Sequence, residues 1–178
     1  MIINTVAVLL LIWALFLMYW VTSAFIGFVR TRVPFVPTPK NDIEFIVREL
    51  NISEKDVFYE LGSGNGRVVF LVEKLSGAKS VGFELTGWTY WYAKFKAKII
   101  KSKAQFFNKD FFKAPWHEAT VIYCYLYPPL MKKMEEKFLR ETKSGSVAIV
   151  RDFPFPALKP NVLHKMPNDH HFYIYKKM

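Results

Sequence analysis

A glycine-rich turn follows a short apolar run in the stretch YELGSGNGRVV, where Glu60 precedes Gly62, Gly64 and Gly66. Turns of this kind bind phosphates, dinucleotides, acyl groups and sulfonium cofactors. The spacing of the glycines and the residues around them must therefore show which of these ligands fits. A phosphate-binding P-loop needs Lys and then Ser or Thr after its last glycine, but Arg and Val follow Gly66. A dinucleotide turn reads G-x-G-x-x-G, and here the third glycine comes one place early. The nucleophile elbow G-x-S-x-G fits poorly because Gly64 holds its central position.

The acid in front of the turn favours a ligand with a cationic end. A carboxylate at Glu60 would repel a pyrophosphate, whereas S-adenosylmethionine (SAM) carries an ammonium and a sulfonium. Two further acids, Glu84 and Asp110, lie at the ends of the next two predicted strands. The first suits the ribose hydroxyls of a nucleoside, and the second can accept a hydrogen bond from the adenine amino group. The pattern predicts a SAM site, with solvated strand ends or helix caps as the alternative roles of Glu84 and Asp110.

These acids can meet only if their strands end at one edge of a sheet. Short apolar runs alternate with helical patterns after position 40, which predicts an α/β fold with a mostly parallel sheet and a C-terminal antiparallel hairpin. In such sheets the ligand lies beyond the carboxyl ends of the strands. The connections FKAPWHEA and PFPALKP are too short for full helices. Strands are predicted at 56–61, 80–85, 104–110, 119–127 and 146–153, helices at 41–50, 67–75, 88–100 and 128–142, and the hairpin at 161–177.

The first 29 residues contain no Asp, Glu, Lys or Arg. About 20 apolar residues are enough to cross a bilayer, so this segment predicts one transmembrane helix. A cleaved signal peptide fits less well, because no basic segment precedes the apolar run. We expect a transmembrane anchor at 1–29, a Pro-rich connector at 30–40 and a catalytic domain at 41–178.

Basic residues set the expected orientation of that anchor. Arg30, Arg32 and Lys40 follow the span while nothing basic precedes it, so the positive-inside bias predicts a single-pass protein, N-out and C-in, with its catalytic domain in the cytoplasm. The net charge of +10 lies entirely after position 29. Such a charge suits nucleic acid or an anionic membrane surface, and the anchor makes the membrane the simpler explanation. The single cysteine, Cys124, agrees with a reducing compartment.

The four histidines do not predict a metal site. His170 and His171 are neighbours on a predicted strand and point to opposite faces. His117 and His164 have no ligand partners nearby in the sequence. We expect surface or structural roles for all four.

The whole chain resembles the membrane-anchored class I, or seven-β-strand, SAM-dependent protein-lysine methyltransferases. That family includes the mitochondrial enzymes acting on the c-subunit of ATP synthase and on adenine nucleotide translocase, with prokaryotic relatives. The likeness rests on the hydrophobic N-terminal segment followed, in the family's order, by VPFVPTP, YELGSGNGRVV, VGFELTGWTYWYAKFKAK, NKDFFK and VAIVRDFPFPALKP. It implies a Rossmann-like domain that methylates the ε-amine of a protein lysine, with Thr38 near the methionine end of the cofactor. The predicted cofactor-binding residues are Thr38, Glu60, Gly62, Ser63, Gly64, Gly66, Glu84, Leu85, Asp110 and Phe111.

Methyl transfer to a lysine requires a neutral amine. With a pKa near 10.4, about one lysine in a thousand is unprotonated near neutral pH, a deficit of roughly 4 kcal/mol. A pocket that desolvates the ammonium lowers its pKa, and aromatic rings hold the cation before deprotonation. Tyr125 and Tyr127, predicted at the end of the fourth strand, are the candidate catalytic residues, with ordinary strand packing as the open alternative.

The segment after the fourth strand argues against nucleic acid as a partner. Methylases of exocyclic base amines carry [DNS]-P-P-[FYW] there, whereas this chain has Tyr-Pro-Pro-Leu at 127–130. We therefore predict a membrane-anchored protein-lysine methyltransferase whose partner is a protein with a lysine at the membrane interface. A small-molecule or lipid methyltransferase at the membrane and a non-catalytic SAM-binding membrane protein are the alternatives.

Overall fold

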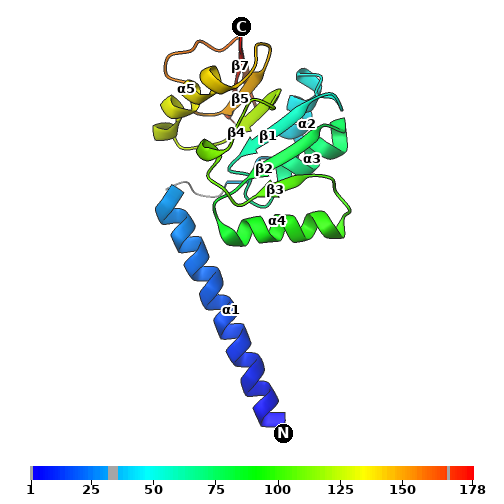
Figure 1. Cartoon of the computed structure of the whole chain (residues 1–178), viewed down its shortest axis with the longest axis vertical. Coiled ribbons are helices and arrows are strands. Elements are labelled where there is room, and N and C mark those ends of the chain that lie inside the picture. The colour runs from blue at the N-terminus through cyan, green and yellow to red at the C-terminus, as the bar shows by residue number, and fades with distance from the viewer. Residues whose placement is uncertain (1, 32–35, 168) are drawn as a thin grey trace.

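A seven-stranded mixed sheet forms the centre of the molecule (Figure 1). The structure, a computed structural model, describes residues 2–31, 36–167 and 169–178, with the backbone alone for 2–4, 23–24 and 26–31. The sheet order is β3-β2-β1-β4-β5-β7-β6; β1 to β5 are parallel, and β7 pairs antiparallel with both β5 and β6. This arrangement confirms the predicted class I methyltransferase fold. The strands are β1 Val57–Leu61, β2 Lys79–Phe83, β3 Gln105–Phe107, β4 Val121–Cys124, β5 Val147–Arg151, β6 Val162–Lys165 and β7 His171–Lys176.

Helices cover both faces of this sheet. On one face, α2 (Lys40–Glu49) and α3 (Arg67–Ser76) pack on β1, β4 and β5, and α4 (Gly87–Ile99) packs against α3 and β3. On the other face lies α5 (Met131–Glu141). Because parallel strands are buried on both faces, they consist of near-continuous apolar residues.

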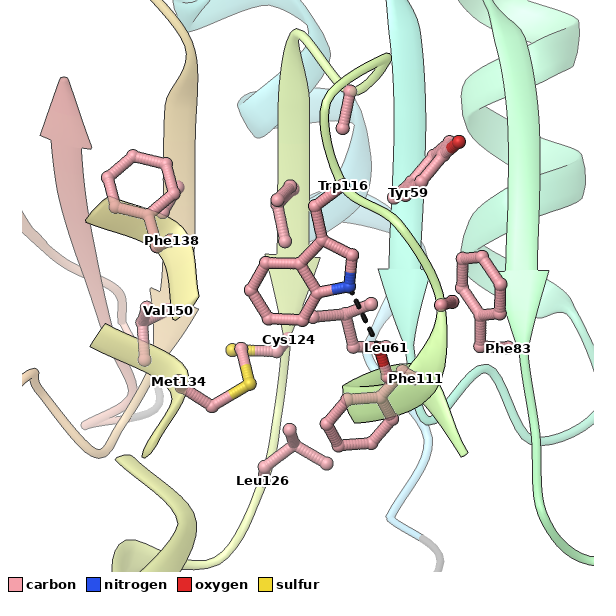
Figure 2. Close-up of a cluster of buried hydrophobic side chains, with 14 of the residues drawn as sticks. Tyr59, Leu61, Phe83, Phe111, Trp116, Cys124, Leu126, Met134, Phe138 and Val150 are labelled. Atoms are coloured by element: carbon pink, nitrogen blue, oxygen red, sulfur yellow. Dashed lines mark hydrogen bonds between the residues drawn. The ribbon is translucent and has the colours of Figure 1, made fainter. Parts of the chain in front are cut away.

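The connection after β3 covers the sheet with aromatic side chains. A 3₁₀ turn, η1 (Phe111–Lys113), is the only helical structure between β3 and β4 in the described chain. Trp116 is fully buried there, and its Nε1 donates to the carbonyl oxygen of Phe111 at 3.0 Å. Figure 2 shows the indole among Leu61, Cys124 and Met134. In place of a helix, the short connection therefore packs aromatic side chains on the sheet, with Trp116 the most deeply buried of them, in agreement with the expectation that no full helix fits.

The five parallel strands are all shorter than predicted, and β3 and β4 differ the most. β3 ends at Phe107, and Asn108 turns back to donate from Nδ2 to the carbonyl oxygens of Glu84 and Leu85 at 2.8 and 3.1 Å. β4 ends at Cys124, which pairs with Leu61, the last residue of β1 before the glycine turn. The helix predicted to open at Pro128 begins instead as a 3₁₀ turn, η2 (Pro128–Leu130).

The N-terminal segment is a single helix, α1 (Ile2–Thr31), that projects away from the sheet domain (Figure 1). Its window Thr5–Thr22 has a mean hydropathy of 2.2, and none of it is buried against the rest of the chain. By length and composition this helix can cross a membrane. Arg32, and the side chain of Arg30, on which the expected orientation depends, lie outside the described part, as does Asn168 in the predicted hairpin turn.

Candidate cofactor and lysine site

The glycine turn leaves β1 at the carboxyl edge of the sheet. Its three glycines, Gly62, Gly64 and Gly66, have φ of 83°, 50° and 76°, in the left-handed region that favours glycine. The N–H groups of Gly62 and Ser63 both donate to the carbonyl oxygen of Phe83 at 2.9 Å, which ties the turn to the end of β2. The hydroxyl of Ser63 is buried and has no hydrogen-bond partner among the described residues.

Two of these glycines are also packed too closely against neighbouring side chains to allow a Cβ atom without a shift. A Cβ added at Gly66 would lie 2.6 Å from the ring of Phe106 on β3. A Cβ at Gly62 would lie 3.1 Å from Leu126, the residue between the two candidate tyrosines. The turn therefore touches both β3 and the segment after β4.

Glu60, directly before the turn, is a buried carboxylate. It is only 6 % exposed, and its Oε2 accepts from the backbone N–H of Val69 at 3.3 Å. Burial raises the pKa of Glu60 well above its usual value; the Val69 hydrogen bond opposes that shift, and the negative charge of Glu84 adds to it. No lysine, arginine or histidine pairs with Glu60 in the described part of the chain. An arriving cation would restore the ionised carboxylate.

Glu84 holds the turn from the end of β2. Its Oε2 accepts from the N–H of Gly64 and its Oε1 from the N–H of Thr86, both at 2.7 Å. Hydrogen bonds to an ionised acceptor are shorter and stronger than neutral ones. One carboxylate thus joins the glycine turn to the loop that begins α4, while Leu85 beside it accepts the hydrogen bond from Asn108.

Asp110 and Phe111 lie at the next strand end. Asp110 caps η1, because its Oδ1 accepts from the N–H of Phe112 at 2.9 Å. This is the helix-cap role that the sequence left open, and a contact with adenine stays a prediction. The Phe111 side chain is buried in the core around Trp116.

Thr38 lies in the connector before α2 and is buried. Its Oγ1 and the hydroxyl of Tyr123 form a buried hydrogen bond of 2.8 Å. Tyr123 lies opposite Glu60 in the pairing of β4 with β1, so both side chains point to the same face of the sheet. Burial raises the pKa of Tyr123, against the effect of the Thr38 hydrogen bond. The structure therefore brings Thr38, Tyr123 and Glu60 together.

The two candidate tyrosines have different surroundings. Tyr125 is half-buried; its ring stacks on Phe153 with centroids 6.5 Å apart, and the guanidinium of Arg151 lies 5.0 Å from its centroid. Tyr127 is 47 % exposed, and the described residues show no ring contact between it and Tyr125. The structure thus places only Tyr125 in an aromatic cluster.

Asp152, which the sequence reasoning missed, forms the centre of that cluster. Its Oδ2 lies 2.8 Å from Nδ1 of His170, and its Oδ1 accepts from the N–H of His171 at 2.9 Å. Burial acts to raise the pKa of Asp152, but these hydrogen bonds and one from the Tyr125 hydroxyl outweigh it, so the pKa is lowered. Asp152 follows β5 just as Glu84 follows β2. The same strand-end pattern, followed as far as the fifth strand, would have identified it.

Arg151, also missed, is buried at the end of β5. It is 1 % exposed, and its NH2 group lies 3.0 Å from Oδ2 of Asp42 in the first turn of α2. This pair anchors α2 to the sheet edge near Tyr125. Within the residues that the structure describes, no cluster of three His, Cys, Asp or Glu side chains has the proximity to hold a metal ion.

Comparison with known proteins identifies several relatives of this chain. Residues 60–162 match the sequence profile of a family described as the ANTKMT methyltransferase domain. The chain is 31 % identical over 152 residues to the ATP synthase c-subunit lysine N-methyltransferase of Rattus norvegicus, covering 83 % of this chain and 69 % of that protein. It is 26 % identical over 150 residues to a protein-lysine N-methyltransferase of Saccharolobus islandicus, covering 81 % and 93 %.

Among solved structures, an RNA methyltransferase from Salinibacter ruber in complex with S-adenosyl-L-homocysteine superposes with a TM-score of 0.75. It is 29 % identical, and the match covers 79 % of this chain and 93 % of that one. The chain spans 61 % and 57 % of the mouse and human counterparts of the rat protein, so those relatives are considerably longer.

Proposed function

Because this chain belongs to the family of the ANTKMT methyltransferase domain, we propose that it transfers the methyl group of SAM to the ε-amine of a lysine in a membrane protein. Membership confirms the resemblance noted in the sequence, the methyltransferase class and SAM as the cofactor. The named relatives are protein-lysine N-methyltransferases. The membrane substrate, the residue roles and the orientation of the chain are the parts that we propose.

One observation carries the cofactor assignment: Glu60 is a buried carboxylate without a cationic partner among the described residues, set against the glycine turn. In the proposal it pairs with the ammonium of the methionine end, near Thr38. Glu84 keeps the turn open and faces the ribose, and Leu85 and Asp110 border the adenine. When bound, SAM supplies an electrophilic methyl carbon, already activated by the sulfonium. The protein then has mainly to position the amine, which can be worth roughly 7 to 11 kcal/mol.

The lysine would approach along the cluster of Tyr125, Asp152 and His170. Asp152 is ionised at neutral pH because its pKa is lowered, so it attracts the incoming ammonium. Its low pKa makes it a poor base, and in this proposal it orients the lysine rather than removing the proton. Tyr125 and Phe153 form an apolar wall that disfavours the charged form of the amine as it leaves water.

The anchor supports a membrane substrate. The predominantly apolar window Thr5–Thr22, none of which is buried against the rest of the chain, is costly to expose to water, and a bilayer would cover it. The protein would then be a single-pass protein with N-out and C-in orientation, with residues 1–29 as anchor, 30–40 as connector and 41–178 as the catalytic domain in the cytoplasm. Tethering would raise the effective concentration of lysines at that membrane surface.

RNA is the second candidate substrate, because a structural relative at 29 % identity is named as an RNA methyltransferase and this chain carries a net charge of +10. The sequence at 127–130 lacks the motif of base-amine methylases. We therefore favour lysine and keep RNA as an outcome of the test.

The test is to incubate the full-length protein in lipid bilayers with methyl-labelled SAM and four acceptors: membrane fractions, soluble proteins, total RNA and purified lipid. Label in integral membrane proteins, absent with Glu84→Ala, is the expected result. Label in RNA or lipid would replace the proposed substrate class, and SAM binding without transfer to any acceptor would indicate a non-catalytic protein. Equal labelling of soluble and membrane proteins, unchanged on deletion of residues 1–29, would remove the membrane substrate.

A further inference from the structure

Helix α4 has two apolar faces, and only one of them is buried. Tyr90, Ala93 and Ala97, spaced three and four residues apart, pack into the core against α3 and β3. Trp91, Phe95 and Ile99 share the opposite side and are 58 %, 65 % and 63 % exposed. Single exposed apolar residues are common, but a row of large ones along one helix marks an interaction surface.

The sequence of α4 and of the segment that follows it is rich in lysine. Between Gly87 and Lys109 the chain contains no Asp or Glu, and the lysines of that stretch are Lys94, Lys96, Lys98, Lys101, Lys103 and Lys109. No ion pair involving any of these six side chains occurs in the described part of the chain. Instead, Lys94 lies over the rings of Tyr90 and Trp91, and Lys96 over Phe70. Their charge is therefore available to an external anionic partner.

The location of α4 shows which partner fits. Figure 1 shows α4 running crosswise to α1, at the part of the domain from which α1 projects. The two helices touch, and the rings of Phe16 and Trp88 form an edge-to-face contact with centroids 5.5 Å apart. A bilayer around Thr5–Thr22 would therefore bring its surface up to α4.

We propose that the outward face of α4, namely Trp88, Trp91, Tyr92, Phe95 and Ile99, lies in the headgroup layer of an anionic bilayer. Helices that lie in this layer bury aromatic and aliphatic side chains at the boundary with the acyl chains, while flanking lysines extend to the phosphates. The face continues from the anchor through the Phe16–Trp88 contact, and its charge complements anionic lipid. Bilayer contact at two places, α1 and α4, would fix the tilt of the domain. It would also hold the carboxyl edge of the sheet, with Glu84 and Asp152, at a defined height above the membrane.

This inference rests on the membrane anchorage in the proposed function and is independent of methyl transfer. Its test uses the full-length protein, one copy per nanodisc, in phosphatidylcholine with phosphatidylglycerol. A fluorophore sensitive to its surroundings is attached at one of three new cysteines: Phe95→Cys on the α4 face, Leu139→Cys on α5, or Leu11→Cys in α1. Leu139 is a matched control, because it is also exposed and α5 lies at the end of the domain away from the α1 N-terminus (Figure 1). The native Cys124 is buried and does not compete for the label.

Lipids carrying a nitroxide near the headgroup, or midway along the acyl chain to reach residue 11, are then added as quenchers, with aqueous iodide as the opposing quencher. The expected result is lipid quenching at residue 95 at least about threefold stronger than at residue 139, and weaker iodide quenching, as for a side chain within the headgroup layer. Equal quenching at residues 95 and 139 overturns the inference while leaving the anchor intact, provided residue 11 is quenched by lipid. A label at residue 11 that iodide reaches and lipid does not overturns both the anchor and this inference. If residue 95 is protected from iodide only with two copies per disc, and lipid does not quench it, the inference is overturned and the face of α4 is a protein interface.

Discussion

Replacing Glu60 with glutamine tests whether SAM binding depends on the negative charge of this side chain, because glutamine has nearly the same shape. Glutamine retains an oxygen that can accept the Val69 hydrogen bond. It loses the negative charge that, in our proposal, pairs with the ammonium of SAM. A hydrogen bond to a charged group is worth about 1.5 to 3 kcal/mol, so the dissociation constant for SAM should rise by roughly 10- to 150-fold.

The same substitution should have the opposite effect on the empty protein. Burial raises the pKa of Glu60 in the folded state, so the folded chain holds this proton more tightly than the unfolded chain. The free energy of unfolding therefore falls as the pH rises from the ordinary glutamate pKa through the raised one. Glu60→Gln removes this loss, and its melting temperature at neutral pH should equal or exceed that of the wild type.

Titration calorimetry in two buffers with different heats of ionisation measures both affinity and proton release. Pairing with the ammonium lowers the pKa of Glu60, so SAM binding to the wild type should release protons at pH values near the raised pKa, and Glu60→Gln should release fewer. Glu54→Gln, at an exposed glutamate, is the control and should match the wild type. Unchanged affinity in Glu60→Gln, or proton release equal to that of the wild type, would refute the cationic-end assignment.

Three further substitutions test other parts of the site. Glu84→Ala removes the acceptor of two backbone N–H bonds and should lower SAM affinity at least about 100-fold by calorimetry; near-normal affinity would rule out its assigned role. Gly66→Ala should cost about 2 to 4 kcal/mol in thermal unfolding, against about 1 kcal/mol for Gly145→Ala, because both glycines have positive φ but only the first would clash; equal losses would contradict the packing argument. Tyr125→Phe removes a hydrogen bond that lowers the pKa of Asp152, so the acid limb of kcat/KM for the lysine substrate should move to higher pH; an unmoved limb would separate Asp152 from lysine recognition.

Sequence reasoning located the parts of the site that depend on strand ends. The positions of Glu60 and Glu84 at the site could be predicted from the apolar runs that contain or precede them, because parallel strands in this fold class bring their carboxyl ends to one edge. Asp152 occupies the equivalent place after β5, but the cofactor pattern in the sequence covers only the first three strand ends and so does not predict it. The Asp110 cap shows the limit of such reasoning: a strand end marks where a side chain lies, while its bonding partner depends on the following turn.

Long-range packing accounts for the rest. The hydrogen bond between Thr38 and Tyr123 joins residues 85 positions apart, and no local pattern encodes it. Tyr125 and Tyr127 have different surroundings because they lie beyond the end of β4, where its pairing with β1 stops at Leu61 and Cys124. The sequence did not reveal the outward apolar face of α4, because a helix that is apolar on two sides lacks the one-sided pattern of an amphipathic helix.

The central claim is tested most directly by tandem mass spectrometry of membranes incubated with the full-length protein and SAM carrying a deuterated methyl group. The proposal predicts deuterated methyl on the ε-nitrogen of a lysine near the bilayer boundary of an integral membrane protein, and none with Glu84→Ala. Deuterated methyl found in RNA or lipid, or on soluble proteins at the same rate, would contradict it.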